Sequence, residues 1–192
     1  MGGPSMNTKN NQRSQETRQR IKEALVTILQ RKDILDLTVS RLCETAHINR
    51  STFYSHYDSI GDVMEELEKE IGVNLMSRFS PDCYDPDQPF SMDNLKIVLI
   101  HIRENQTFYR AYLTQSTSQN RLDWAFSQLL QHIVQPMMRR RHVDDTATEY
   151  YFSFFRAGFV AIIQQWLNNE CREAPEIILS YIDNILGHPY IR

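Results

Sequence analysis

The stretch TVSRLCETAHINRSTFYSHY, residues 38–57, decides the fold of this chain. Thr38 stands where a side-chain oxygen can cap a short helix, and Asn49 stands where another can cap a second one. Phe53 and Tyr57, four positions apart, can face inward from the second helix. Two short capped helices joined by a tight turn predict a helix-turn-helix.

The rest of the chain is also patterned as helices. Nearly every segment repeats apolar residues at helical spacing, and no alternating strand stands between turn signals. We therefore predict an all-α fold of about nine helices, with an N-terminal three-helix helix-turn-helix domain followed by a C-terminal helical domain. Around the motif, helices are expected at approximately residues 14–31, 62–77, 93–104, 106–114, 120–140, 146–169 and 175–186.

Local signals mark several of these helix ends. Ser59 with Asp62, and Thr146 with Glu149, have the spacing of capping boxes. Pro136 is expected to kink or shorten its helix, because proline removes a backbone donor and clashes with the preceding turn.

The domain boundaries follow from this pattern. We expect residues 1–13 to comprise an expression-tag remnant and a flexible N-terminus, because the first five residues precede a second methionine, Met6. Residues 14–60 are expected to form the helix-turn-helix DNA-binding domain. Residues 61–192 are expected to form the helical regulatory and dimerisation domain.

Charge is distributed unevenly along the chain. Residues 1–60 carry nine basic and six acidic side chains, a balance of +3, which leaves −6 for the remainder of a chain whose net charge is −3. A basic N-terminal module on an acidic body suits a protein of which only one end meets phosphate. Chance variation of surface charge is the alternative explanation.

Several function classes find no support. Apolar runs such as residues 97–100 are far too short to span a membrane, and a cytoplasmic location is expected. Cys43, Cys83 and Cys171 lie far apart and are expected to be reduced thiols. No histidine or cysteine pair has metal-ligand spacing, although such residues can meet in space. We predict no metal site, no cofactor and no enzymatic activity, because no nucleophile elbow, phosphate loop or paired-carboxylate site is present.

The second helix of the motif begins with short polar residues. Arg50 can bind guanine through two hydrogen bonds, and Ser51 or Thr52 can reach a base edge or a thymine methyl group. Tyr54 and His56 can donate to phosphate oxygens. A solvated helix face is the alternative interpretation of these five side chains.

Residues 38–57 resemble the DNA-binding signature of TetR-type transcriptional regulators. The threonine cap, the alanine, the aliphatic turn residue, the Thr-aromatic-Tyr triplet and the His-aromatic pair match in type and spacing. The resemblance covers residues 14–75 by motif and the rest of the chain only by helix number.

This resemblance implies a homodimer whose recognition helices enter successive major grooves of a palindromic operator in double-stranded DNA, with an unknown small-molecule effector in a cavity of the C-terminal helices. No membrane partner is implied. The resemblance places Thr38, Tyr54 and His56 at the DNA backbone. It places four further residues nearer the base edges: Ser40, Arg50, Ser51 and Thr52.

Two positions depart from the family pattern. His47 stands where the family has glycine, so the turn is expected to be slightly altered. Ile60 stands where the family has a phosphate-binding lysine, and Arg13, Arg18 and Arg20 are candidates to compensate for its absence.

The C-terminal region is less specific. Residues 108–113 resemble a C-terminal domain in the TetR branch that includes activators of dihydroxyacetone kinase operons and metal-responsive regulators. The segment from Tyr150 to Trp166 is apolar on nearly all sides, so it must be buried on more than one face. With residues 175–186 it is expected to form a four-helix dimer interface.

Two further sets of residues are predicted in this region. The candidate ligand-pocket residues are Phe108, Tyr112, Trp124, Tyr151 and Phe155. The candidate dimer-interface residues are Phe154, Gly158, Ile162, Tyr181 and Ile185.

The function expected from this pattern is a repressor that binds its operator as a dimer and is released by a small molecule, with coupling through the helix over residues 62–77. One alternative is a partner-responsive transcriptional activator of the same family without a small-molecule pocket. The other is a protein-binding helical adaptor that has lost DNA binding.

Overall fold

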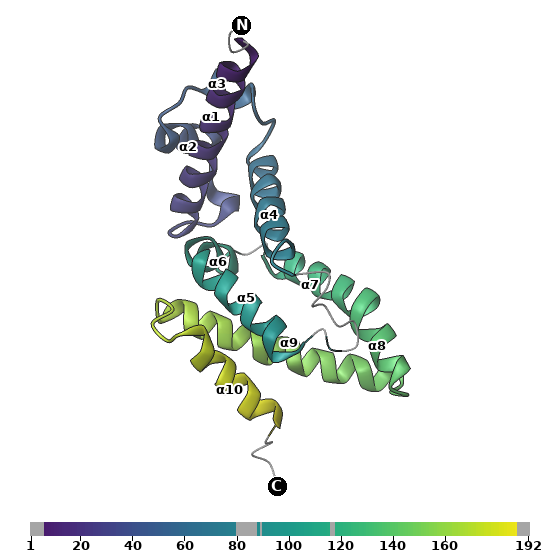
Figure 1. Cartoon of the computed structure of the whole chain (residues 1–192). Coiled ribbons are helices and arrows are strands. Elements are labelled where there is room, and N and C mark those ends of the chain that lie inside the picture. Colours follow the sequence, from purple (N-terminus) through teal and green to yellow (C-terminus); the bar gives the residue numbers. More distant parts are fainter. Residues whose placement is uncertain (1–5, 80–87, 89, 116–117, 188–192) are drawn as a thin grey trace, which may run out of the picture. The chain divides into compact units, whose positions relative to one another are not determined.

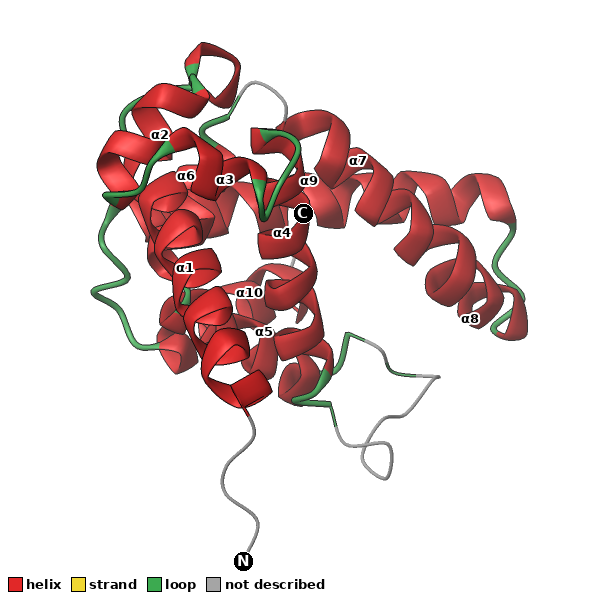
Figure 2. Ribbon diagram, turned by 90° about the horizontal axis from the view of Figure 1, so that it is seen from above, coloured by secondary structure: helices red, strands yellow, loops and turns green. Residues whose placement is uncertain are grey.

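The computed structural model describes residues 6–79, 88, 90–115 and 118–187, apart from the side chains of residues 6–10, 118–121, 124, 186 and 187. This described part consists of helices, turns and loops and contains no strand, which confirms the all-α prediction (Figure 2). The chain divides into two compact units, unit 1 (Met1–Val73) and unit 2 (Asn74–Arg192).

Unit 1 contains the helix-turn-helix. Its elements are α1 (Met6–Leu29), a 3-10 turn (Ile34–Asp36), α2 (Val39–Ala46), α3 (Arg50–Tyr54) and most of α4 (Ile60–Met76) (Figure 1). The first helix begins at Met6, well before the predicted residue 14. The buried core contains apolar side chains from all four helices, among them Ile21, Leu25, Leu42, Phe53 and Val63.

The predicted caps of unit 1 are confirmed. The Arg41 amide donates to Thr38 Oγ1 at 3.3 Å, which caps α2. At the start of α4, the Ser59 amide donates to Asp62 Oδ2 at 2.9 Å and the Asp62 amide donates to Ser59 Oγ at 3.3 Å. This reciprocal pair is a capping box that uses aspartate.

Unit 2 contains α5 (Met92–Glu104), α6 (Gln106–Leu113), α7 (Ser118–Leu129), a π turn (Leu130–Val134), α8 (Gln135–Arg140), α9 (Asp145–Asn168) and α10 (Pro175–Gly187). Its main core joins one face each of α5, α9 and α10 around the almost fully buried Trp166. The indole N–H of Trp166 donates to the Glu173 carbonyl at 3.1 Å. Since α7, the π turn and α8 are continuous, the described residues form nine separate helical segments, as predicted.

Two helix ends differ from the prediction. At Pro136 the helix does not shorten: a π turn over Leu130–Val134 precedes the proline, and the Gln135 amide bonds to the Leu130 carbonyl, five residues back. The cap of α9 is Asp144, whose carboxylate accepts from the Ala147 amide at 2.9 Å, so the Thr146 capping box is wrong. The helix therefore begins at Asp145, and the side chain of the preceding Asp144 accepts from the amide of its third residue.

Candidate nucleic-acid interface

Helix α3 is anchored in unit 1 by Phe53, which packs beside Tyr57. Phe53 is fully buried and its ring centroid lies 6.0 Å from that of Tyr57, which is 5% exposed. With these two side chains inside, the outward positions are occupied by polar residues. Five of the seven predicted DNA-binding residues are exposed, and Thr52 and His56 are half-buried; the exposed ones are Thr38, Ser40, Arg50, Ser51 and Tyr54.

Asn49 organises the start of α3 more fully than a simple cap does. Its Oδ1 accepts from the Thr52 amide at 2.7 Å, from the Ser51 hydroxyl at 2.7 Å and from the Thr52 hydroxyl at 2.8 Å. Both hydroxyl protons are therefore directed at Asn49, and the two hydroxyl oxygens keep lone pairs that can accept. The sequence predicted the cap but not this control of the neighbouring hydroxyl groups.

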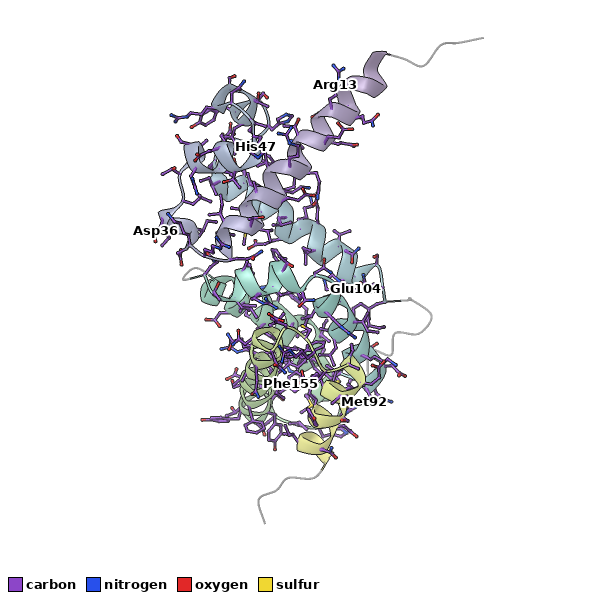
Figure 3. All side chains as sticks on the ribbon, turned by 90° about the vertical axis from the view of Figure 1, so that its left-hand side faces the viewer. Arg13, Asp36, His47, Met92, Glu104 and Phe155 are labelled. Carbon is purple, nitrogen blue, oxygen red and sulfur yellow. The ribbon has the colours of Figure 1, made fainter. Side chains whose placement is uncertain are left out.

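The turn between α2 and α3 takes the conformation that glycine usually supplies. His47 has φ 52° and ψ 47°, which is left-handed, and its place is labelled in Figure 3. The Ile48 amide donates to the Cys43 carbonyl at 3.0 Å and the His47 amide to the Glu44 carbonyl at 3.2 Å. These bonds form a Schellman motif, so the expected alteration of the turn does not occur.

Arg18 is held between α1 and α4. Its guanidinium forms an ion pair with Glu66, donates to the His56 carbonyl at 3.4 Å and lies 5.0 Å from the centre of the Tyr57 ring. Burial, and after it the Glu66 carboxylate, raises the pKa of Tyr57 to about 12. Arg18 is thus a structural residue.

The other two candidate compensating arginines differ from each other. Arg20 donates to two backbone carbonyls in the turn, those of Ala46 and His47. Arg13 is exposed. The guanidinium groups of Arg18 and Arg20 thus make internal contacts, and compensation for the missing lysine at Ile60 by any of the three arginines stays a prediction.

A buried lysine completes the link between α1 and α4. Lys22 is 6% exposed and its Nζ lies 2.5 Å from Glu70 Oε1 and 3.4 Å from Glu66 Oε1. Because a buried ammonium group requires partners, this pairing fixes the register of α1 against α4. Hydrogen bonds from Ser59 lower the pKa of Asp62 at the start of the same α4.

The predicted dimer-interface residues in unit 2 gather on α9 and α10. Phe154 is 72% exposed, Tyr181 52% and Ile185 48%, while Gly158 is exposed with open space where a Cβ would stand. Ile162 is half-buried. A shallow apolar groove of about 60 Å³ runs between the two helices and is lined by Phe154, Phe155, Gly158, Phe159, Ile162, Ile182 and Ile185.

The predicted ligand-pocket residues fall into separate groups. Phe108 is buried on α6 and stacks on Tyr112 with ring centroids 5.3 Å apart. Phe155, labelled in Figure 3, stacks on Phe159 at 5.7 Å within the α9 surface, and Tyr151 is 60% exposed. The side chain of Trp124 lies outside the described residues.

The described part of the chain contains neither a cluster of metal-ligating side chains nor a helix that could span a membrane. Within those residues, three or more histidine, cysteine, aspartate or glutamate side chains do not gather where they could hold a metal ion. In the same part, every helix is too short or too polar to cross a membrane. Cys43 and Cys171 are buried, and burial raises the pKa of both thiols; Cys83 lies outside the described residues.

Comparison with known proteins places the chain in a family. Residues 92–188 match the TetR-type family described as Transcriptional regulator C-terminal region. An uncharacterized HTH-type transcriptional regulator, YxbF of Bacillus subtilis (strain 168), is 26% identical over 82% of this chain, which spans only 41% of the relative's length.

Two solved structures share the fold. A TetR transcriptional regulator from Streptococcus agalactiae 2603V is 24% identical, with a TM-score of 0.64 over 94% of this chain and 98% of the other. The dihydroxyacetone kinase operon activator DhaS is 20% identical, with a TM-score of 0.56 over 89% of this chain and 94% of the other. On its C-terminal match and its helical fold, this chain belongs to the TetR family of transcriptional regulators.

Proposed function

We propose that this regulator is a homodimeric repressor that reads a palindromic operator with α3 and is released from DNA by a small-molecule effector. The observation that carries the DNA-binding part is the arrangement of α3: Phe53 anchors the helix inside unit 1, while Arg50, Ser51 and Tyr54 are exposed beside it. A helix that presents short polar side chains from a rigid support suits the major groove.

Each polar residue of the site has a proposed contact. Arg50 donates to guanine O6 and N7, while Thr38, Tyr54 and His56 donate to phosphate oxygens and Ser40 lies nearer the base edges. Because Asn49 takes the hydroxyl protons of Ser51 and Thr52, these two side chains accept from the exocyclic amine of adenine or cytosine. The Thr52 methyl group is free to meet a thymine methyl.

The exposed faces of α9 and α10 support dimerisation. Tyr150, Phe154 and Tyr181 are between 52% and 74% exposed, and such a patch of large apolar side chains is costly in water. On α9 the exposed stripe also contains Ala157, Gly158 and Ala161, whose small size lets a second helix approach closely. A second copy of the chain covers this surface in an isologous four-helix arrangement.

One observation favours a second candidate, a partner-responsive activator. The groove between α9 and α10 holds about 60 Å³, whereas sites for small organic ligands have volumes of roughly 300–1,000 Å³. A structurally similar protein, DhaS, is by its name an operon activator. In that case a protein partner, and no small molecule, changes DNA binding.

The test is a fluorescence-anisotropy titration of the full chain against duplexes from its gene's own upstream region, with a random duplex as competitor. We expect preferential binding that weakens as salt increases, because phosphate contacts release counterions. Arg50→Ala is expected to reduce that preference, whereas Arg31→Ala removes the same charge beyond the end of α1 and retains it. Equal binding of upstream and random duplexes by the wild-type chain contradicts the proposal.

A further inference from the structure

The turn that leads into the recognition helix holds a non-glycine residue in a left-handed conformation. His47 is exposed, so its side chain has no burial to hold it there. The Schellman hydrogen bonds of the turn use the carbonyls of Cys43 and Glu44. Two carbonyls at the end of α2, those of Ala46 and His47, are left for other donors.

A single side chain from α1 meets both of these carbonyls. Arg20 Nη2 donates to the Ala46 carbonyl at 2.6 Å and to the His47 carbonyl at 2.8 Å. These residues are 26 and 27 positions away in the sequence, so the contact joins the first helix to the turn across the fold. A guanidinium at the C-terminal end of a helix also complements the partial negative charge of its last carbonyls.

We propose that Arg20 is a positioning residue for DNA recognition. It holds the His47 turn in its left-handed form and thereby sets the direction in which α3 leaves α2. Arg20 acts on DNA through α3 and does not depend on contact with a phosphate. This inference rests on the proposed DNA-binding function.

The alternative is that Arg20 binds phosphate directly with its remaining N–H groups. The two roles differ in their dependence on residue 47. Glycine adopts the left-handed conformation without a steric penalty, so the turn of a His47→Gly variant needs no guanidinium to hold it. A phosphate contact, in contrast, is lost with Arg20 whichever residue occupies position 47.

The experiment is a double-mutant cycle in the full chain. It uses Arg20→Met, which retains the aliphatic stem but removes the donors, together with His47→Gly and the double variant. Arg31→Met is the matched charge control, because Arg31 is an exposed arginine just beyond α1. Operator affinity is measured over a range of salt concentrations, and thermal unfolding is measured without DNA.

We expect Arg20→Met to weaken operator binding about tenfold, the effect of losing a charge-assisted hydrogen bond. In the His47→Gly background the same change is expected to cost little. The slope of log affinity against log salt should match that of Arg31→Met. A tenfold loss that persists in the His47→Gly background, with a slope reduced by about one, overturns the proposal in favour of a phosphate contact.

Thermal unfolding separates this inference from the proposed function. If the wild-type chain prefers no DNA sequence, the DNA-binding proposal fails, but the turn can still be examined. We expect Arg20→Met to lower the midpoint of unfolding, and His47→Gly to remove most of that loss. Strictly additive effects of the two substitutions on the midpoint contradict a role for Arg20 in holding the turn.

Discussion

Unit 1 and unit 2 differ in how far their large aromatic side chains are exposed to water. In unit 1 two aromatic residues of the motif turn inward, Phe53 at 0% and Tyr57 at 5% exposure, while Tyr54 and the polar groups face out. In unit 2, α9 and α10 leave Tyr150, Phe154 and Tyr181 largely exposed. In the proposed function the polar surface of unit 1 reads DNA, and a second copy of the chain covers the open apolar face of unit 2.

The largest effect is expected from opening the closed core of unit 1. Phe53→Ala removes a fully buried ring and should cost about 3–5 kcal/mol of folding free energy, with loss of DNA binding. Chemical unfolding followed by circular dichroism measures the cost. Tyr54→Ala, at the exposed neighbouring position, is the control and should retain most of the stability. A Phe53→Ala chain as stable as the wild type would mean that α3 is not anchored through this ring.

The open face of unit 2 is tested with a charge. Phe154→Glu places a carboxylate in the proposed interface and should weaken the dimer by about 3 kcal/mol, because an unpaired charge is buried there. Sedimentation equilibrium should show monomers at concentrations where the wild type is dimeric, and operator affinity should fall with it. Ser153→Glu puts the same charge at an exposed position beside this stripe, without removing a large apolar side chain, and should weaken the dimer less. If Phe154→Glu dimerises as tightly as the wild type, this face of α9 is not the dimer interface.

A smaller effect is expected at the start of the recognition helix. Asn49→Ala removes the oxygen that accepts from the Thr52 amide and two hydroxyl groups, and should cost about 1 kcal/mol. It should also relax the choice of base opposite Ser51 and Thr52, whose hydroxyl protons become free. Anisotropy with operator variants measures this change, and Asn49→Ser, which keeps a capping oxygen, is the control. An unchanged base preference in Asn49→Ala would show that the Asn49 cap does not influence base recognition.

The smallest expected effect depends on pH and belongs to unit 2. His101 is fully buried beside Tyr109 and Asn105; burial first, and then Arg78, lowers its pKa, against the opposing effect of Glu104. His101 therefore binds a proton less readily in the folded state than in the unfolded state. The stability from this group is complete above the ordinary pKa of about 6.5 and is lost as pH falls towards the lower folded pKa.

Urea unfolding at about pH 7.5 and pH 5.5 tests this expectation. The wild type should lose stability between the two conditions, and His101→Leu should lose less. His132→Leu changes an exposed histidine and should keep the wild-type pH dependence. An identical response in all three chains would contradict the role of His101.

What the sequence could predict was chiefly local. The caps at Thr38, Asn49 and Ser59 depend on residues within four positions, so spacing alone was sufficient. The cap of α9 was misplaced because Thr146 and Glu149 have the spacing of a capping box, while the preceding Asp144 satisfies the amides first.

The long-range features of the candidate site could not be predicted in the same way. Arg18 and Arg20 look alike in the sequence as basic residues of a DNA-binding module, yet one pairs with Glu66 and the other with the turn carbonyls. These partners are 26 or more positions away, and only the packing of α1 against α2 and α4 brings them together. The strained, left-handed conformation of His47 could be predicted from the sequence, but the hydrogen bond from Arg20 to its carbonyl could not.

Whether α3 reads DNA is tested most directly by selecting bound sequences from a random duplex library with the full-length wild-type chain and with Arg50→Ala. We expect the wild type to enrich an inverted repeat whose half-sites are centred about one helical turn apart. In Arg50→Ala the repeat should remain, with a guanine preference lost at one position of each half-site. A wild-type chain that enriches no sequence would contradict the claim that α3 reads DNA.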